Sequence, residues 1–333
     1  MPCFFRRYTM QQWQPRQYRP RRYRKKSRLR HFHWGRLLAV LLGAVLLLFG
    51  VISLIGYGRD WIGTRNTSKE LQTVYYDAPT DEPALMTETP SPMPAPKETA
   101  VPTVSPVPTS SPAPRLEAMA YPNNPKLTVS NRFKALRRES KYIMGWLAVG
   151  NLVDEPVMQR DDTFYLTHDA KGKENVNGAI FLDASIGIKA RPYTYILYGH
   201  NMKTGAMFGS LRNYENRNFY HTDPFITFDT MYEDGRYVIF AVGSISTEEY
   251  GRHYVDFHDL KSADREKRQA AIDALISASV FTCPIDVQVD DQILLLVTCA
   301  EKDQDRRVVA ARRVRDGEDE AQLKTLVERS WKR

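Results

Sequence analysis

A run of 22 uncharged residues, LLAVLLGAVLLLFGVISLIGYG, occupies positions 37–58. As a helix it would reach roughly 33 Å, enough to cross the ~30 Å hydrocarbon core of a bilayer. The alternative is a cleaved signal peptide, whose apolar region is normally about 7–15 residues long and ends at an A-x-A-like site. This run is longer and no such site follows it, so the sequence predicts a retained transmembrane helix.

The charge of the chain is unevenly distributed around this run. Lys and Arg number 47 against 39 Asp and Glu, a net charge of +8, but residues 1–36 hold 12 of the basic residues and no acidic one. The remainder carries 35 basic and 39 acidic residues, a net charge of −4. Because cations favour the cytoplasmic side, we expect a basic cytoplasmic tail at 1–36 and residues 59–333 outside the cell membrane.

The basic tail has two interpretations. Its Lys and Arg side chains can set topology and contact anionic lipid headgroups. The aromatic residues among them, Tyr18, Tyr23, Phe32 and Trp34, would also suit RNA, but no folded platform accompanies them. Since the excess charge is confined to a tail, a nucleic-acid-binding domain is disfavoured and membrane lipid is the expected partner.

Proline marks the next segment. Eleven of the 20 prolines lie between Pro79 and Pro114, with Thr, Ser and Ala between them. Such a composition buries too little apolar surface to fold and favours extended polyproline II. The sequence therefore predicts a disordered extracellular stalk over 59–119.

The residues able to build a core lie between about 120 and 333, so we expect one folded domain. Its main part is expected at 120–315, followed at 316–333 by a C-terminal tail that is either an exposed amphipathic helix or loose. Short apolar runs separated by turn residues indicate a mainly β domain. Helical spacing favours one helix near its start, at 131–142, and a longer one at 262–281, where Ser262 can cap and Asp264 suits the helix dipole. The runs expected to be strands are 143–149, 178–182, 193–198, 225–228, 237–245, 286–289, 293–298 and 308–311.

Motifs of several common enzymes are missing from the sequence. It has no HExxH, no zinc-like Cys/His spacing, no P-loop, no G-x-G-x-x-G and no G-x-S-x-G. We therefore expect neither a metal site nor a cofactor. Three cysteines, Cys3, Cys283 and Cys299, are too few for a disulfide scaffold. A Cys283–Cys299 disulfide is possible outside the cell, but it would consume the more promising thiol.

Three kinds of chemically useful group, a thiol, an imidazole and a guanidinium, stand at the ends of apolar runs. Cys299 ends the run 293–299, and His200 ends 193–200. Arg306 and Arg307 open the run that follows. A thiol needs a basic or cationic neighbour to act as a nucleophile at neutral pH. These groups could converge on one edge of a sheet, although a cysteine in the core could occupy the same position.

The sequence resembles the class B sortases at these positions. The resemblance rests on Tyr198-Gly199-His200-Asn201-Met202, on Leu296-Val297-Thr298-Cys299 and on the Arg-Arg-Val-Val-Ala-Ala-Arg that follows. It spans most of 130–315. Two positions depart from the pattern: Leu295 replaces a threonine of the family, and Val297 stands where class B often has serine. The resemblance implies a closed sortase-type β-barrel, an N-terminal helix and a helix inserted between late strands.

The resemblance also implies roles for four residues. Cys299 would be the nucleophile, and His200 would protonate the leaving amine and then activate the incoming one. An arginine would stabilise the oxyanion. The family's alanine five residues beyond it matches Ala311 for Arg306, so we expect Arg306 rather than Arg307. Tyr198 would line the substrate groove.

The implied function is that of a membrane-anchored cysteine transpeptidase. Its partners would be secreted proteins with a C-terminal sorting signal and an amine acceptor from peptidoglycan precursor in a Gram-positive cell wall. A pilin-polymerising sortase, a cysteine protease and a non-catalytic stalked adhesin are the alternatives. The pilin-polymerising sortase and the protease differ from the cell-wall transpeptidase in the acceptor that resolves the thioester. If the protein were an adhesin, Cys299 and His200 would be expected to lie apart.

Overall fold

The computed structural model describes residues 34–79, 115–299 and 305–333, with only the backbone described for 34–37 and 299. Nearly all of the predicted basic tail and the proline-rich stretch of the predicted stalk therefore lie outside the described residues. The chain divides into two units, residues 1–53 and 54–333. The division falls inside helix α1, Trp34–Asp77.

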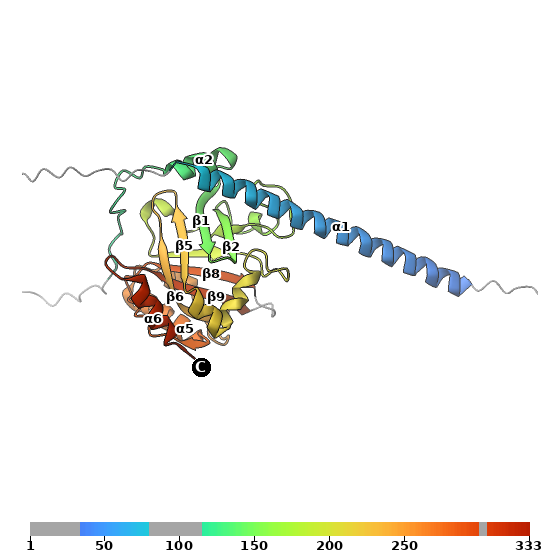
Figure 1. Ribbon diagram of the computed structural model, residues 1–333. Helices are drawn as coiled ribbons and strands as arrows, with labels where there is room; N and C mark the ends of the chain where they lie inside the picture. The colour runs from blue at the N-terminus through green and yellow to red at the C-terminus, as the bar shows by residue number, and fades with distance from the viewer. Residues whose placement is uncertain (1–33, 80–114, 300–304) are drawn as a thin grey trace, which may run out of the picture. The chain divides into compact units, whose positions relative to one another are not determined.

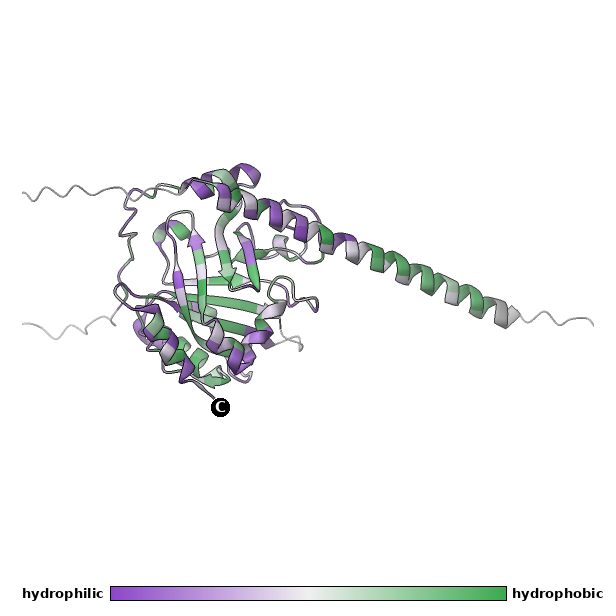
Figure 2. Cartoon of the chain, in the orientation of Figure 1, coloured by the Kyte–Doolittle hydropathy of each residue, from purple (hydrophilic) through white to green (hydrophobic). Residues whose placement is uncertain are grey.

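The first part of α1 has the character of a membrane span. Every described residue from 38 to 57 is exposed, and this part of the helix is apolar around its whole circumference (Figure 2). The helix is long and apolar enough to cross a membrane. A helix that exposes apolar side chains on all faces needs an apolar surrounding.

The second part of α1 packs against the folded domain. Thr64, Ser68, Leu71 and Tyr75 are buried, and their spacing places them on one face of the helix. The Tyr75 ring stacks on that of Trp146 with 4.4 Å between centroids. The predicted stalk boundary at residue 59 therefore differs from the structure, in which 59–77 is helical and contributes to the core.

Polar contacts fasten the same helix face to the domain. Tyr75 donates a 2.5 Å hydrogen bond to Asp229, and Gln72 donates to the backbone of Asp154 at 2.8 Å. The Ser68 hydroxyl donates to Glu155 Oε2 at 2.7 Å. Burial raises the pKa of Glu155 to about 7, against a smaller lowering by the Ser68 hydrogen bond.

The Glu155 carboxyl makes the stability of the protein depend on pH. Because its pKa is higher in the folded than in the unfolded chain, its contribution to stability is complete below about pH 4.5 and is lost as pH rises through about 7. We expect Glu155→Gln to match the wild-type melting temperature at pH 5 and to exceed it at pH 8. Glu249→Gln, on an exposed residue, is the control. The prediction would be contradicted if the melting temperatures of wild type and Glu155→Gln differed by the same amount at every pH from 5 to 8.

Within the described residues, eight strands close into a barrel in the order β1-β2-β3-β4-β8-β9-β6-β5 (Figure 1). The pairs β2–β3 and β4–β8 are parallel, and the other neighbours are antiparallel. This confirms the mainly β, closed-barrel prediction. The strands are β1 Ile143–Val149, β2 Val153–Met158, β3 Ile180–Leu182, β4 Thr194–Tyr198, β5 Phe225–Thr230, β6 Arg236–Ser246, β8 Ile293–Cys299 and β9 Asp305–Arg313.

Helices and short 3₁₀ turns connect the strands. The inserted helix is α5, which begins after an Asp264 cap whose side chain accepts from the backbone N–H groups of Glu266 and Lys267. The cap is thus Asp264 rather than the predicted Ser262. The elements outside the barrel are α2 Asn131–Glu139, η1 Phe164–Leu166, η2 Ile188–Ala190, η3 Gly209–Glu215, α3 Arg217–Thr222, α4 Phe257–Lys261, α5 Arg265–Ala278, β7 Phe281–Thr282, α6 Glu320–Glu328 and β10 Trp331–Lys332.

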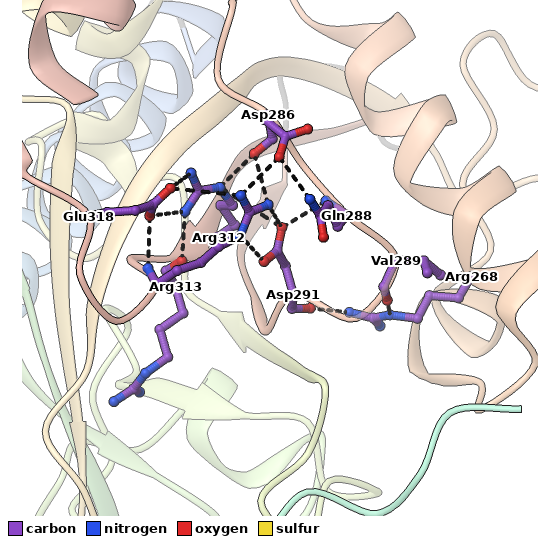
Figure 3. A network of polar contacts seen from close by, with 9 residues as sticks. Arg268, Asp286, Gln288, Val289, Asp291, Arg312, Arg313 and Glu318 are labelled. Atoms are coloured by element: carbon purple, nitrogen blue, oxygen red, sulfur yellow. Dashed lines mark hydrogen bonds and ion pairs between the residues drawn. The ribbon is translucent and has the colours of Figure 1, made fainter. Parts of the chain in front are cut away.

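Residues 286–289, predicted as a strand, form a loop held by arginine side chains (Figure 3). Arg312 Nε donates to the Asp286 carbonyl at 2.6 Å, and Arg268 Nε donates to the Val289 carbonyl at 2.7 Å. Arg312 also forms a bidentate ion pair with Glu318. These carbonyls therefore have guanidinium partners in place of a neighbouring strand.

Arg268 is fully buried in this arrangement, and we expect its loss to be strongly destabilising. Its guanidinium also donates to the carbonyls of Tyr193 and Asp291, at 3.0 and 2.8 Å. Burial lowers its pKa to about 10. Arg268→Met would leave buried carbonyls unpaired, at a cost of about 3–5 kcal/mol in the free energy of unfolding.

Thermal unfolding would show this as a fall in melting temperature of about 10 °C. The matched control is Lys267→Met on the same helix, because Lys267 is exposed and its loss is expected to change stability by less than about 0.5 kcal/mol. Equal melting temperatures for the two variants would show that the Arg268 contacts contribute little.

The C-terminal residues belong to the folded domain. Leu323 and Val327 of α6 are buried, and β10 pairs with β7. Of the two alternatives for 316–333, the structure has the amphipathic helix, but it packs on the folded domain and is not a separate tail. At the other end, Leu116 is buried and its N–H donates to the Ala263 carbonyl at 2.8 Å, so the structured part begins before the predicted residue 120.

Candidate active site

The order of the strands brings the ends of three predicted runs together. Strands β4 and β8 are parallel neighbours in which Tyr198 is paired with Val297. His200 and Cys299 each lie two residues further on, so they leave the same edge of the sheet side by side. On the other side of β8, Cys299 is paired with Arg306 of β9. The backbone thus holds the three positions on adjacent strands.

A groove of about 300 Å³ lies at this edge. Three of the four predicted site residues line it: Tyr198, His200 and Arg306. The side chain of Cys299 lies beyond what the structure describes, but its neighbour Thr298 lines the groove. The other lining residues are Asp162, Leu166, Phe181, Gly199 and Val297.

His200 is fixed by the loops on either side of it. Its Nε2 donates a 2.6 Å hydrogen bond to the Leu166 carbonyl, so that nitrogen carries a proton. The His200 carbonyl accepts from the Phe208 N–H at 3.0 Å. Gly199 permits this packing, because a Cβ there would lie 2.8 Å from the Phe208 ring. The imidazole is thereby held on the groove wall.

The two arginines at the start of β9 have different surroundings. Arg306 lines the groove. Arg307 is half-buried, and its Nε donates to Glu215 Oε1 at 2.7 Å. Adjacent residues on a strand project to opposite faces. Of the two side chains, that of Arg306 therefore faces the groove, and that of Arg307 projects to the other face of the strand.

Tyr198 belongs to a polar cluster under the groove that the sequence did not predict. Its hydroxyl donates to Asp183 Oδ2 at 3.3 Å, and Lys261 Nζ forms an ion pair with the same oxygen at 3.1 Å. Burial and the Asp183 carboxylate raise the pKa of Tyr198, so its phenol is neutral. In the sequence Asp183 directly follows an apolar run, which is only a weak indication of a site residue. No feature of the sequence indicated Lys261.

Comparison with known proteins gives the family. A model of the sortase domain matches residues 151–314. Sortase B of Listeria monocytogenes is 30% identical over 54% of this chain and 71% of its own length. Sortase B of Staphylococcus aureus is 28% identical over 56% of this chain and 75% of its own.

Solved structures agree with these relatives. A Bacillus anthracis protein similar to sortase B matches the fold with a TM-score of 0.57 at 24% identity, over 76% of this chain and 97% of that one. A substrate complex of Staphylococcus aureus sortase B matches with a TM-score of 0.50 at 27% identity, over 57% of this chain and 88% of that one. The chain belongs to the sortase family of cysteine transpeptidases, in class B.

Proposed function

We propose that this sortase is anchored in the membrane by residues 37–58 and cleaves the C-terminal sorting signal of secreted proteins, which it transfers to a cell-wall amine. The observation that carries the proposal is the register of β4, β8 and β9. It places His200, Cys299 and Arg306 at one edge of the sheet, next to the groove. The basic residues before the span favour a cytoplasmic N-terminus and an extracellular catalytic domain.

In this mechanism the Cys299 thiolate attacks the scissile carbonyl and forms a C–S bond. Arg306 stabilises the negative charge on the carbonyl oxygen. The C–N bond then breaks as imidazolium His200 gives a proton to the leaving amine, which produces a thioester. The incoming amine loses a proton to His200, attacks the thioester and releases Cys299.

The groove supports a peptide substrate. Leu166, Phe181 and Val297 give it apolar walls, and the neutral Tyr198 phenol adds a polar contact. The comparable Staphylococcus aureus sortase B structure is a complex with substrate. We therefore propose Tyr198 as a residue that contacts the sorting signal.

The test is to incubate the full chain in detergent with a library of sorting-type peptides, with and without amines. The full chain is needed because residues 64–75 contribute to the core. We expect cleavage whose product depends on oligoglycine or diaminopimelate-type amines. Preference for a lysine peptide would indicate pilin polymerisation, and resolution by water alone would indicate a protease. Absence of an acyl-enzyme with every peptide would refute the proposal.

A further inference from the structure

A loop of the barrel lies beside the first turns of α1 that follow the apolar run. Asn175 Nδ2 donates to the Asp60 carbonyl at 3.0 Å, and the Val176 N–H donates to Asp60 Oδ2 at 3.4 Å. Asn177 Nδ2 donates to Thr64 Oγ1 at 2.9 Å. Asp60 stands only two residues, or about 3 Å of helix, beyond the uncharged run.

The surface around this contact combines apolar, aromatic and basic side chains. Trp61 is 39% exposed, Ile62 is 53% exposed and Val176, on the loop, is 52% exposed. The Arg65 guanidinium lies 5.4 Å from the Trp61 ring centroid. We call the exposed side chains within 57–65 and 173–176 the span-end patch. Its other exposed side chains are Tyr57, Arg59, Lys173 and the acidic Glu174.

This composition is the one found where proteins meet lipid headgroups, with aromatic rings and basic groups at the level of the interface. Arg59, Arg65 and Lys173 outnumber Asp60 and Glu174, which favours an anionic surface. The patch also continues directly from the predicted span. A lipid bilayer is therefore the occupant that fits an otherwise unexplained group of exposed apolar residues.

We infer that the loop at 173–176 is a second lipid contact, through which the barrel rests on the headgroups of an anionic bilayer in addition to its spanning helix. The inference depends on the proposed membrane anchoring. The Val176 side chain enters the interface, Lys173 binds lipid phosphate, and the hydrogen bonds to Asp60 keep the loop at the end of the span.

The proposed lipid contact affects the groove because backbone hydrogen bonds join residues 175–179 to the segment 165–167. The Asn175 N–H donates to the Thr167 carbonyl and the Ala179 N–H to the Tyr165 carbonyl, both at 2.9 Å. Leu166, between those acceptors, binds His200 and lines the groove. A loop resting on lipid thus holds one groove wall near the headgroups.

Photo-crosslinking of the full chain in phosphatidylcholine nanodiscs, with or without phosphatidylglycerol, tests the inference. Benzoylphenylalanine is introduced in place of Leu47, Val176 or Trp331. Leu47 lies in the span, and Trp331 is an equally exposed apolar residue on β10. We expect lipid adducts from positions 47 and 176 but not from 331, with a higher yield at 176 in the anionic nanodiscs.

A charge reversal gives the second measurement. Lys173→Glu is expected to lower the adduct yield at position 176 about fivefold in anionic nanodiscs, whereas Lys189→Glu, on another exposed lysine, leaves it unchanged. A yield at 176 no greater than at 331, with position 47 labelled, would overturn the loop contact alone. If position 47 also gave no lipid adduct, the proposed membrane anchoring would be contradicted, and the inference with it.

Discussion

Replacing Cys299 with alanine is expected to abolish acyl-enzyme formation and to lower the transfer rate by roughly 10⁴-fold or more. The reason is that the proposed thioester forms on the Cys299 sulfur, at the edge where β4 and β8 end and β9 begins. The measurement is mass spectrometry of the full chain after incubation with a sorting-type peptide, together with the rate of amine-dependent product formation.

Cys283 is the matched control for this experiment. It is a free thiol that accepts a 3.0 Å hydrogen bond from the Tyr220 hydroxyl. Burial raises the pKa of the Cys283 thiol, which makes it a poor nucleophile at neutral pH. We expect Cys283→Ala to keep its acyl-enzyme and its transfer activity. Loss of activity in this variant with full activity in Cys299→Ala would reverse the assignment.

The barrel and the edge that carries the candidate site were predictable because the ends of the apolar runs coincide with the ends of the strands. Residues 143–149 form β1 as predicted, since a short run of buried apolar residues bounded by turns suits a strand. His200 and Cys299 were predicted as strand-end residues. Their adjacency follows from the parallel pairing of β4 and β8, whereas the sequence indicated only that the ends of the two runs could converge on one edge of a sheet.

The features that the sequence missed depend on contacts between distant residues. The docked face of α1 is polar in its first half, where Thr64 and Ser68 bind Asn177 and Glu155 of the folded domain. Its apolar part is therefore too short to be recognised as a stripe. Strand β2 includes Pro156, which normally counts against a strand.

Buried arginines explain the wrong strand at 286–289. Arg268 and Arg312 are charged residues of a kind that is almost never fully buried, so composition predicts both on the surface. In the structure they are 0% and 1% exposed and bind backbone carbonyls of the loop. The sequence gives no sign of this, because the guanidinium groups and their acceptors are brought together only by the completed fold.

The choice between Arg306 and Arg307 leads to the second large expected effect. Arg306→Ala is expected to lower kcat/KM by about 10²–10³-fold, the usual cost of removing a donor to a developing oxyanion. Arg307→Ala removes the partly exposed ion pair with Glu215, a loss of about 0–1 kcal/mol in stability. Its kcat/KM should stay close to that of the wild type.

The two variants form a matched pair, since each removes one guanidinium from neighbouring positions of the same strand. Steady-state rates with a sorting-type peptide and saturating amine, together with melting temperatures, separate a catalytic from a structural loss. Arg306→Lys tests the role further, because a lysine restores the charge but not the planar pair of donors. Equal, small effects of Arg306→Ala and Arg307→Ala would mean that neither guanidinium stabilises the oxyanion, and that the groove relies on other donors for the acyl-transfer step.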